Sequence, residues 1–312
     1  MSKYRNKLPQ MKDKIFVTDG GLETTLVFHE KLPLPFFAAF DLLKDQSGLQ
    51  TLRRYFERYA TIAREQGAGF ILEAPTWRAS KDWAQKLGYD AITLADANRK
   101  AIGLMSEVRE NYETPASPMV ISGNLGPRGD GYVMDMKMTV AQARDYHSQQ
   151  IETFAQTDAD MVSVLTLNYT EEATGIALAA RDHGMPVAIS FTVETDGQLP
   201  SGDSLAEAIR KTDEQTDAYP AYYMINCAHP SHFDHVLNDA YGMHERIRGV
   251  RANASKRSHA ELDNTEDLDD GNPDELGNHY QQLRKLLPNL NVLGGCCGTD
   301  HRHIEAICMA VA

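Results

Sequence analysis

The stretch IFVTDGG at residues 15–21 begins with three apolar residues and ends in Asp-Gly-Gly, as a buried parallel strand and its loop would. Seven further apolar runs end in a similar Gly, Asn, Pro or Thr signal, and stretches with apolar residues near 3.6-residue spacing separate them. The seven runs are FILEAPT (70–76), MVISGNLG (119–126), MVSVLTL (161–167), VAISFTV (187–193), YYMINCA (222–228), IRGVRAN (247–253) and NVLGGCC (291–297). Eight alternating strand and helix units predict parallel βαβ connections and an α/β fold.

The number of units favours one particular α/β architecture. Eight units match a single (β/α)8 TIM barrel, in which the carboxyl ends of all strands open on one face. The alternative is a doubly wound open sheet, but no G-x-G-x-x-G fingerprint follows the stretch at 15–21. Because no repeat, low-complexity tract or flexible linker divides the chain, we predict one barrel domain over residues 1–312.

Two stretches interrupt the alternation of strands and helices. GDGYVMDMKM (129–138) predicts a long loop after the third strand, and residues 253–278 predict another after the seventh. The second stretch is acidic from Glu261 to Glu275, with no Lys or Arg between them. Two interpretations remain open for it: a solvated loop that folds over the barrel mouth, or a cation site.

Composition narrows the class of partner. The formal net charge of −13 argues against nucleic acid or an anionic membrane, since both favour a basic face. A small molecule is therefore the expected partner. The first residues, MSKYRNKLPQMKDKIF, lack the apolar core of a secretion signal, and four cysteines are too few for a disulfide scaffold. We predict a soluble cytoplasmic protein with free thiols, and the sequence leaves open whether it forms a homo-oligomer.

Three of the four cysteines fall at predicted strand ends. Cys227 ends the sixth strand in INCAHP, and Cys296 and Cys297 end the eighth in GGCCGT. The ends of parallel barrel strands open on the same face, so we expect the three thiols to converge. Adjacent strand residues point to opposite sides, and the glycines that flank the cysteine pair supply the freedom to turn there.

Three converging thiolates need a cation, and Zn²⁺ bound through sulfur is the natural one. Three protein ligands leave a fourth position for water or substrate, which indicates a catalytic site. The alternative is that the three are buried apolar cysteines, as Cys308 is expected to be in the terminal helix HIEAICMAVA. His301 and His303 at the start of that helix are alternative ligands, and His229 could orient the site.

Several motifs together resemble the homocysteine S-methyltransferase family, whose zinc-dependent barrels include betaine-, S-methylmethionine- and folate-dependent enzymes. The resemblance runs nearly end to end and implies three zinc ligands, Cys227, Cys296 and Cys297. It also implies that Asp19, beside Gly20 and Gly21, helps to hold the amino acid acceptor. The motifs that carry it are TDGGLETTL (18–26), GNLGP (123–127), SFTVETDGQLPSGDSL (190–205), INC (225–227) and GGCCGT (294–299).

The resemblance implies a zinc-dependent S-methyltransferase that moves a methyl group to a small thiol, with homocysteine giving methionine as the leading acceptor. The donor would be a cationic sulfur or nitrogen compound, or a corrinoid brought by a separate protein, because no cobalamin or folate module accompanies the barrel. Four aromatic residues could flank a cationic donor by cation-π contact, or could serve packing alone. They are Phe36, Phe37, Trp77 and Tyr169.

The sequence departs from the family pattern at two strand ends. The family usually carries a glutamate late in the fourth strand, in a pattern like LETIP, where this chain reads VLTLN and places Leu165 followed by Thr166. The second strand ends in EAPT, so Glu73 could supply the missing carboxylate for the acceptor amine, with Thr166 in the same substrate site. If Glu73 is instead structural, the acceptor is a different thiol. A zinc-binding barrel without catalysis is a further alternative, and a zinc hydrolase is disfavoured because no HExxH motif is present.

Overall fold

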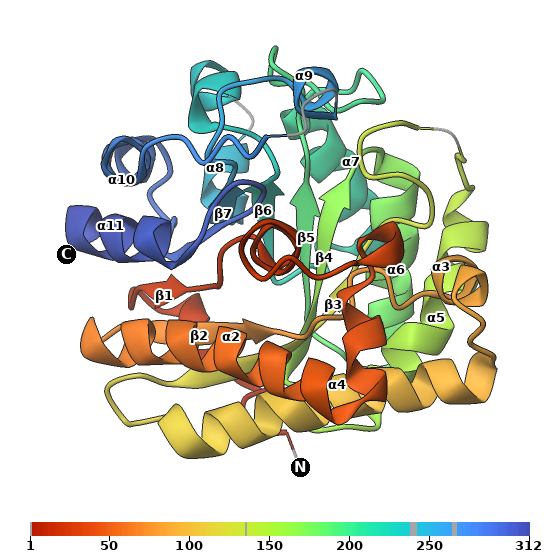
Figure 1. Cartoon of the computed structure of the whole chain (residues 1–312). Helices are drawn as coiled ribbons and strands as arrows, with labels where there is room; N and C mark the ends of the chain where they lie inside the picture. Colours follow the sequence, from red (N-terminus) through yellow and green to blue (C-terminus); the bar gives the residue numbers. More distant parts are fainter. Residues whose placement is uncertain (1, 135, 238–241, 264–266) are drawn as a thin grey trace.

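The computed structural model describes residues 2–134, 136–237, 242–263 and 267–312. Eight parallel strands pair in sequence order, and pairing of the eighth with the first closes them into a barrel (Figure 1). The strands are β1 (Phe16–Val17), β2 (Gly69–Glu73), β3 (Met119–Leu125), β4 (Met161–Leu167), β5 (Val187–Phe191), β6 (Tyr222–Asn226), β7 (Ile247–Ala252) and β8 (Val292–Gly295). The predicted (β/α)8 barrel is confirmed, and each of the eight predicted runs contains one strand.

Helices surround the barrel and alternate with its strands (Figure 1). They are α1 (Leu22–Thr24), α2 (Gln46–Glu65), α3 (Lys81–Lys86), α4 (Ala91–Tyr112), α5 (Val140–Ala155), α6 (Thr170–Asp182), α7 (Leu205–Thr216), α8 (Met243–Arg246), α9 (His259–Asp263), α10 (Pro273–Leu286) and α11 (His301–Val311). Shorter helical turns are η1 (Pro9–Met11), η2 (Thr25–His29), η3 (Pro35–Phe37), η4 (Ala39–Lys44), η5 (Pro230–His232) and η6 (Asp234–Val236). Among the described helices we find no candidate for a membrane span.

The prediction of one long loop over 253–278 is wrong in part, because this range contains α9 and the start of α10 at Pro273. Helix α10 starts there because a proline fits the first helical position and the Asn272 side chain accepts a hydrogen bond from Glu275 N. The loop predicted at 129–138 is free of helix and strand in its described residues. It therefore follows β3 as an irregular segment at the barrel mouth.

The acidic stretch 261–275 bonds to cations of the chain itself. Asp269 lies 3.4 Å from Arg257 and accepts from Ser255 at 2.6 Å. Glu275 pairs with Lys256. Residues 264–266 lie outside the described part of the chain, and in the described part this stretch contains no cluster of ligands that could hold a metal. The described residues therefore fit the solvated-loop interpretation.

The barrel interior has an apolar layer below a polar one. Phe16, Ile71, Val120, Met161 and Tyr222 belong to a buried apolar cluster. Since side chains alternate along a strand, the inward residues nearer the carboxyl ends form a second layer. That layer is polar: Ser122 Oγ lies 2.7 Å from Ser163 Oγ, and Ser190 Oγ donates to Asn226 Oδ1 at 2.7 Å.

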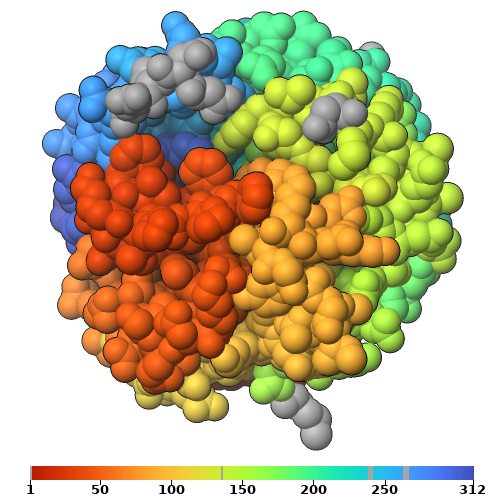
Figure 2. All heavy atoms as spheres, turned by 45° about the vertical axis from the view of Figure 1, so that its right-hand side comes forward, coloured from red at the N-terminus to blue at the C-terminus, as the bar shows by residue number. Residues whose placement is uncertain are grey.

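Segments that follow different strands meet on one face of the molecule. Figure 2 shows the segments after β1 (orange-red), β2 (orange) and β3 (yellow-green) lying edge to edge on that face. On the outside, α11 packs against α10, and Cys308 is buried there, as its apolar surroundings predict. The helical shell is close-packed at points where glycine is required.

Gly123 of β3 provides a test of this packing. A Cβ built there would lie 2.5 Å from the ring of Phe154 in α5, so Gly123→Ala should lower the free energy of unfolding by about 1–3 kcal/mol. A Cβ at Gly103 in α4 would meet no atom within 4 Å, so Gly103→Ala should leave stability unchanged or raise it by up to about 1 kcal/mol. Denaturant unfolding measures both, and equal stabilities of the two variants would contradict the packing described.

Candidate metal centre

The three cysteines expected to converge do so at the carboxyl ends of the strands. Cys227 directly follows β6, and Cys296 and Cys297 directly follow β8. Their sulfur atoms all lie within 4.8 Å of one another, and Cys227 Sγ and Cys297 Sγ are 3.5 Å apart. No other group of three or more His, Cys, Asp or Glu side chains in the described residues has this proximity.

Backbone turns aim the three sulfur atoms at one point. Not all of the glycines that were expected to supply these turns do so. Cys227 has a φ of 57° and Gly298 a φ of 78°, both in the left-handed region. Gly294 and Gly295 instead lie in β8, where an added Cβ would stand about 2 Å from a threonine hydroxyl. The expectation that this pair supplies turning freedom is therefore wrong, because close packing explains them.

The cluster favours one thiolate among three sulfurs. Hydrogen bonds from Cys227 and Cys297, with help from Arg251 and Asn226, hold the pKa of Cys296 well below its usual range. The thiolate at Cys296 in turn raises the pKa of Cys227. A closely spaced, free set of soft sulfur donors fits a thiophilic cation such as Zn²⁺, because such a cation stabilises all three as thiolates.

Tyr132, in the loop after β3, reaches the same point. Its hydroxyl oxygen lies 3.1 Å from Cys227 Sγ and 3.6 Å from Cys297 Sγ. Its ring packs 4.1 Å from the His259 ring, and a hydrogen bond joins His259 Nε2 to the Cys227 carbonyl. Burial raises the pKa of Tyr132 well above its usual range, so the phenol stays protonated. The sequence analysis missed this residue, whose only signal was its place in the long loop at 129–138.

Asn226 ties the cysteine loop to a strained point in β4. Its side chain accepts from Thr166 N and donates to Thr166 Oγ1, both at 2.8 Å, and its amide lies 3.9 Å from Cys296 Sγ. Thr166 has a φ of 65°, which is unusual for a β-branched residue. The register between β4 and β5 shifts next to it. This bulge brings Thr166 beside the cysteines, and its hydroxyl is already hydrogen-bonded.

Asp19 is held by the protein's own side chains. One carboxylate oxygen lies 2.9 Å from Arg251 Nη2, and the other accepts from Tyr55 Oη at 2.9 Å. Gly20 and Gly21 follow Asp19 and pack against the cysteine loop, since a Cβ at Gly21 would stand 2.6 Å from the Cys296 carbonyl oxygen. No sequence signal pointed to Arg251, because nothing in a strand pattern distinguishes an inward arginine.

Two further carboxylates face this region. Glu73 ends β2 and is 3% exposed, and Glu73 Oε2 has no hydrogen-bond partner among the described residues. Burial raises the pKa of Glu73 to about 7, against the opposing effect of Arg251. Glu23 of α1 is half-buried, and burial and the charge at Cys296 raise its pKa to about 7 as well. Glu73 is therefore a buried strand-end residue, and nothing in the sequence had pointed to Glu23.

The other expected residues lie in varied surroundings. Leu165 is 6% exposed in β4, and its carbonyl accepts from Trp77 Nε1 at 3.3 Å. Tyr169 is buried, whereas Phe36 and Phe37 are exposed at 45% and 54%. Trp77 is thus hydrogen-bonded to β4, and the Arg78 guanidinium lies 4.0 Å from the centre of its ring.

The two histidines considered as alternative ligands, and His229, which was considered for orienting the site, bond elsewhere. His229 Nδ1 lies 2.8 Å from Ser231 Oγ, and a contact of 2.8 Å joins His303 Nε2 to the Asp270 carbonyl. His301 Nδ1 lies 3.5 Å from Arg58 Nη1. None of the three belongs to the cysteine cluster.

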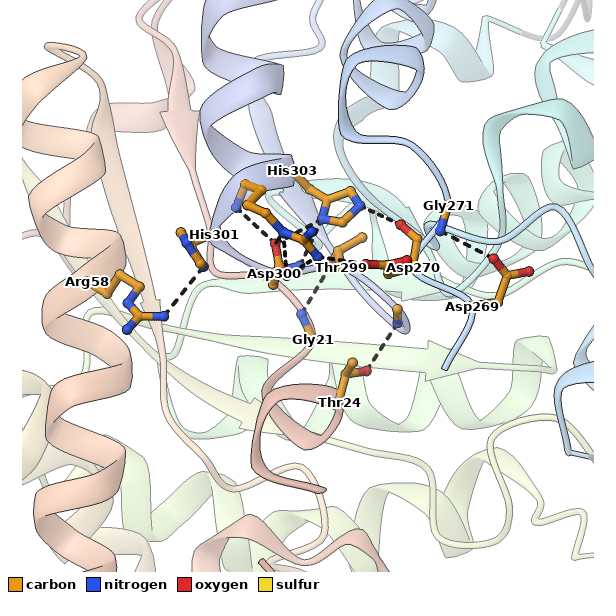
Figure 3. A network of polar contacts seen from close by, with 12 residues as sticks. Gly21, Thr24, Arg58, Asp269, Asp270, Gly271, Thr299, Asp300, His301 and His303 are labelled. Atoms are coloured by element: carbon orange, nitrogen blue, oxygen red, sulfur yellow. Dashed lines mark hydrogen bonds and ion pairs between the residues drawn. The ribbon is translucent and has the colours of Figure 1, made fainter. Parts of the chain in front are cut away.

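A polar network braces the cysteine loop from behind (Figure 3). Gly21 N donates to Thr299 Oγ1, and Gly298 N donates to Thr24 Oγ1, both at 3.1 Å. Asp300 caps α11 and contacts His303 at 3.2 Å. These contacts join the loop after β1 to the loop after β8, so hydrogen bonds hold the segment that carries the cysteine pair.

The structure is a closed eight-stranded α/β barrel with three cysteine sulfurs gathered at its mouth, close enough together to hold a metal ion. Residues 16–311 match the sequence model of the homocysteine S-methyltransferase family. The chain belongs to this family, and it is accordingly a thiol S-methyltransferase.

Individual relatives are distant in sequence and close in fold. Selenocysteine Se-methyltransferase of Brassica oleracea var. italica is 24% identical over 318 residues, which cover 93% of this chain and 87% of the relative. Homocysteine S-methyltransferase 2 of Arabidopsis thaliana is 23% identical, with 93% and 91% covered. The Escherichia coli homocysteine methyltransferase MmuM superposes in its metallated form with a TM-score of 0.76 at 19% identity, over 96% of each chain. Its apo form gives a TM-score of 0.69.

Asp300 provides a test of the bracing network. Burial opposes its ionisation, but hydrogen bonds from His303 and Arg302 outweigh burial and hold its pKa well below the usual range. Asp300→Asn keeps a helix cap and removes the charge, so at neutral pH we expect a loss of about 1–2 kcal/mol in unfolding free energy. Because the folded-state pKa is depressed, this contribution is present above the unfolded pKa of about 3.9 and is lost as the pH falls further.

The measurement is urea unfolding of both proteins across pH, and the difference between them should shrink below about pH 4. Asp96→Asn is the matched control, because Asp96 forms an exposed pair with Arg99 on α4 and should change stability by less than about 0.5 kcal/mol. A difference for Asp300→Asn that grows as the pH falls would contradict the assignment.

Proposed function

We propose that this chain is a zinc-dependent S-methyltransferase that transfers a methyl group from a cationic or corrinoid donor to homocysteine and so forms methionine. The observation that carries the proposal is the gathering of three cysteine sulfurs within 4.8 Å at the mouth of the barrel. We assign Cys227, Cys296 and Cys297 as the metal ligands. When bound, zinc would supply the Lewis acidity that keeps a thiol ionised at neutral pH.

The chain's own residues prepare the site for this chemistry. The Asn226 amide and the Tyr132 hydroxyl point polar hydrogens at the cysteine sulfurs. These hydrogens offset part of the negative charge on the sulfur atoms. Arg251 balances Asp19 below the mouth. The acceptor thiolate attacks the methyl carbon, a carbon–sulfur bond forms, and the bond from methyl to the donor atom breaks with its electron pair leaving on the donor. The thiol proton passes to solvent.

We assign the acceptor amine to Glu73, in place of the glutamate that the family carries where Leu165 stands here. Glu73 Oε2 is buried and has no partner in the part of the chain that the structure describes, and leaving such a group unsatisfied is costly. An ammonium group would satisfy it and would favour its ionised form. Asp19, Gly20, Gly21 and Thr166 line the same substrate site in this proposal, with Asp19 acting through its pair with Arg251.

We place a cationic donor near the acidic groups of the barrel mouth. Glu23, Glu73 and Asp19 lie in the region of Arg251 and the cysteines, and their ionised carboxylates would attract a sulfonium or betaine donor. A corrinoid donor would require a separate carrier protein. We further infer that residues 1–312 form one domain that acts in the cytoplasm in methionine biosynthesis, with the homo-oligomeric state open.

Replacement of one cysteine tests the metal. Cys297→Ser should lower zinc from about one ion per chain to near none and should abolish methyl transfer, because two thiolates and a hydroxyl bind Zn²⁺ far more weakly. Cys308→Ser, a buried cysteine on α11, is the matched control and should keep both. Elemental analysis of protein purified without chelator gives the answer, and an unchanged zinc content in Cys297→Ser would refute the assignment.

Replacement of Glu73 tests the acceptor site. Glu73→Gln should raise the KM for homocysteine by about tenfold or more with a smaller change in kcat, because an ammonium-to-carboxylate contact is lost. Zinc content should stay unchanged. Glu65→Gln, an exposed glutamate on α2, is the control and should leave the KM unaltered.

A second variant separates a lost contact from a general disturbance of the barrel. Adding Leu165→Glu to the Glu73→Gln protein restores a carboxylate at the usual family position and should recover part of the affinity for homocysteine. Turnover of homocysteine by Glu73→Gln at the original KM would contradict the assignment of Glu73 to the acceptor amine.

A further inference from the structure

A second concave site lies between η2, α2 and α11, away from the cysteines. The cavity is small, about 70 Å³, and none of the three clustered cysteines lines it. Its charged and titratable lining residues are His29, Glu30, Arg54, Arg58 and His301.

Two guanidinium groups in this cavity lack a carboxylate partner. Arg54 and Arg58 are one turn apart on α2, so their side chains share a helix face. In the described part of the chain, Arg54 donates to Thr51 Oγ1 at 3.1 Å, and Arg58 contacts His301 Nδ1 at 3.5 Å (Figure 3). Neither forms an ion pair there, although the whole chain has a net charge of −13.

Hydroxyl groups add uncharged donors to the same walls. Thr25 and Thr51 both line the cavity. Thr25 is 8% exposed, and its Oγ1 has no hydrogen-bond partner among the described residues. A buried hydroxyl without a partner is uncommon in folded proteins. Asp300, which precedes His301, does not compete for the arginines, because Arg302 binds it at 2.7 Å.

We propose that this cavity binds a phosphorylated small molecule, whose phosphoryl group lies between Arg54 and Arg58. Two guanidinium forks and nearby hydroxyl donors suit an oxyanion with three acceptor oxygens better than a singly charged carboxylate. Glu30, the sole carboxylate among the lining residues, leaves the cavity net positive.

The cavity adjoins the acceptor side of the barrel mouth through two tyrosines. Tyr55 and Tyr59 line it. Tyr55 Oη donates to Asp19 and to the Gly20 carbonyl, at 2.9 and 3.0 Å. A Cβ at Gly20 would stand 2.9 Å from Tyr59 Oη. An occupant of the cavity would therefore contact side chains that hold the loop after β1.

Isothermal titration of the full chain with inorganic phosphate, pyrophosphate and adenosine monophosphate tests the proposal, with acetate and citrate as carboxylate probes. At least one phosphorylated probe should bind saturably at one site per chain. Arg54→Gln with Arg58→Gln should weaken that binding by at least about tenfold, since two charge-assisted contacts are lost. Arg53→Gln is the matched control, because Arg53 lies on the same helix and pairs with Glu107. It should leave the affinity unchanged.

Three outcomes would overturn the proposal: no saturable binding of any phosphorylated probe, equal affinity in the double variant, or saturable binding of carboxylates only. Circular dichroism and zinc content of the double variant confirm that the barrel is intact. The titration involves neither acceptor nor donor, so its result is independent of the methyl-transfer assignment.

Discussion

The buried guanidinium of Arg251 joins three strand ends of the barrel. From β7, its Nε donates to the Gly295 carbonyl at 3.1 Å, its Nη2 donates to the Gly20 carbonyl at 3.2 Å, and it pairs with Asp19. A charge this deep costs several kcal/mol unless it is paired and hydrogen-bonded, so these contacts must hold together. The loop after β1 is thereby fixed against the end of β8, one residue before the cysteine pair.

These contacts fix the backbone next to the cysteine cluster, whose sulfur atoms would otherwise repel one another. Three sulfurs within 4.8 Å would repel one another as thiolates, and the surrounding donors Asn226, Tyr132 and Arg251 offset part of that repulsion. Strain at Thr166 and Cys227, both with positive φ, is concentrated at the same place. Such strain persists only where neighbouring contacts over-determine the backbone. Asn226 makes two hydrogen bonds to Thr166, and His259 makes one to the Cys227 carbonyl.

Much of the fold was predictable because it depends on local patterns. Eight apolar runs with turn signals, alternating with helical periodicity, predicted all eight strands and the closed barrel. The error at 253–278 came from weighing its acidic residues above the cap at Asn272 and the proline at 273, which start α10. The candidate ligands were found because a barrel topology brings distant strand ends together. Arg251 and Tyr132 were missed, because no spacing rule reports which inward side chain or loop hydroxyl reaches a given point.

By itself the sequence determined the order of strands and helices, the strand ends that carry Cys227, Cys296 and Cys297, and the departure from the family at Leu165. These depend on residue type and periodicity, which are local properties. Only the tertiary structure decided that Glu73 is buried with its Oε2 unpaired among the described residues, that Gly294 and Gly295 serve close packing, and that Arg54, Arg58 and His301 share a cavity. Burial, pKa and charge pairing depend on residues far apart in the chain, so they are set when the barrel closes.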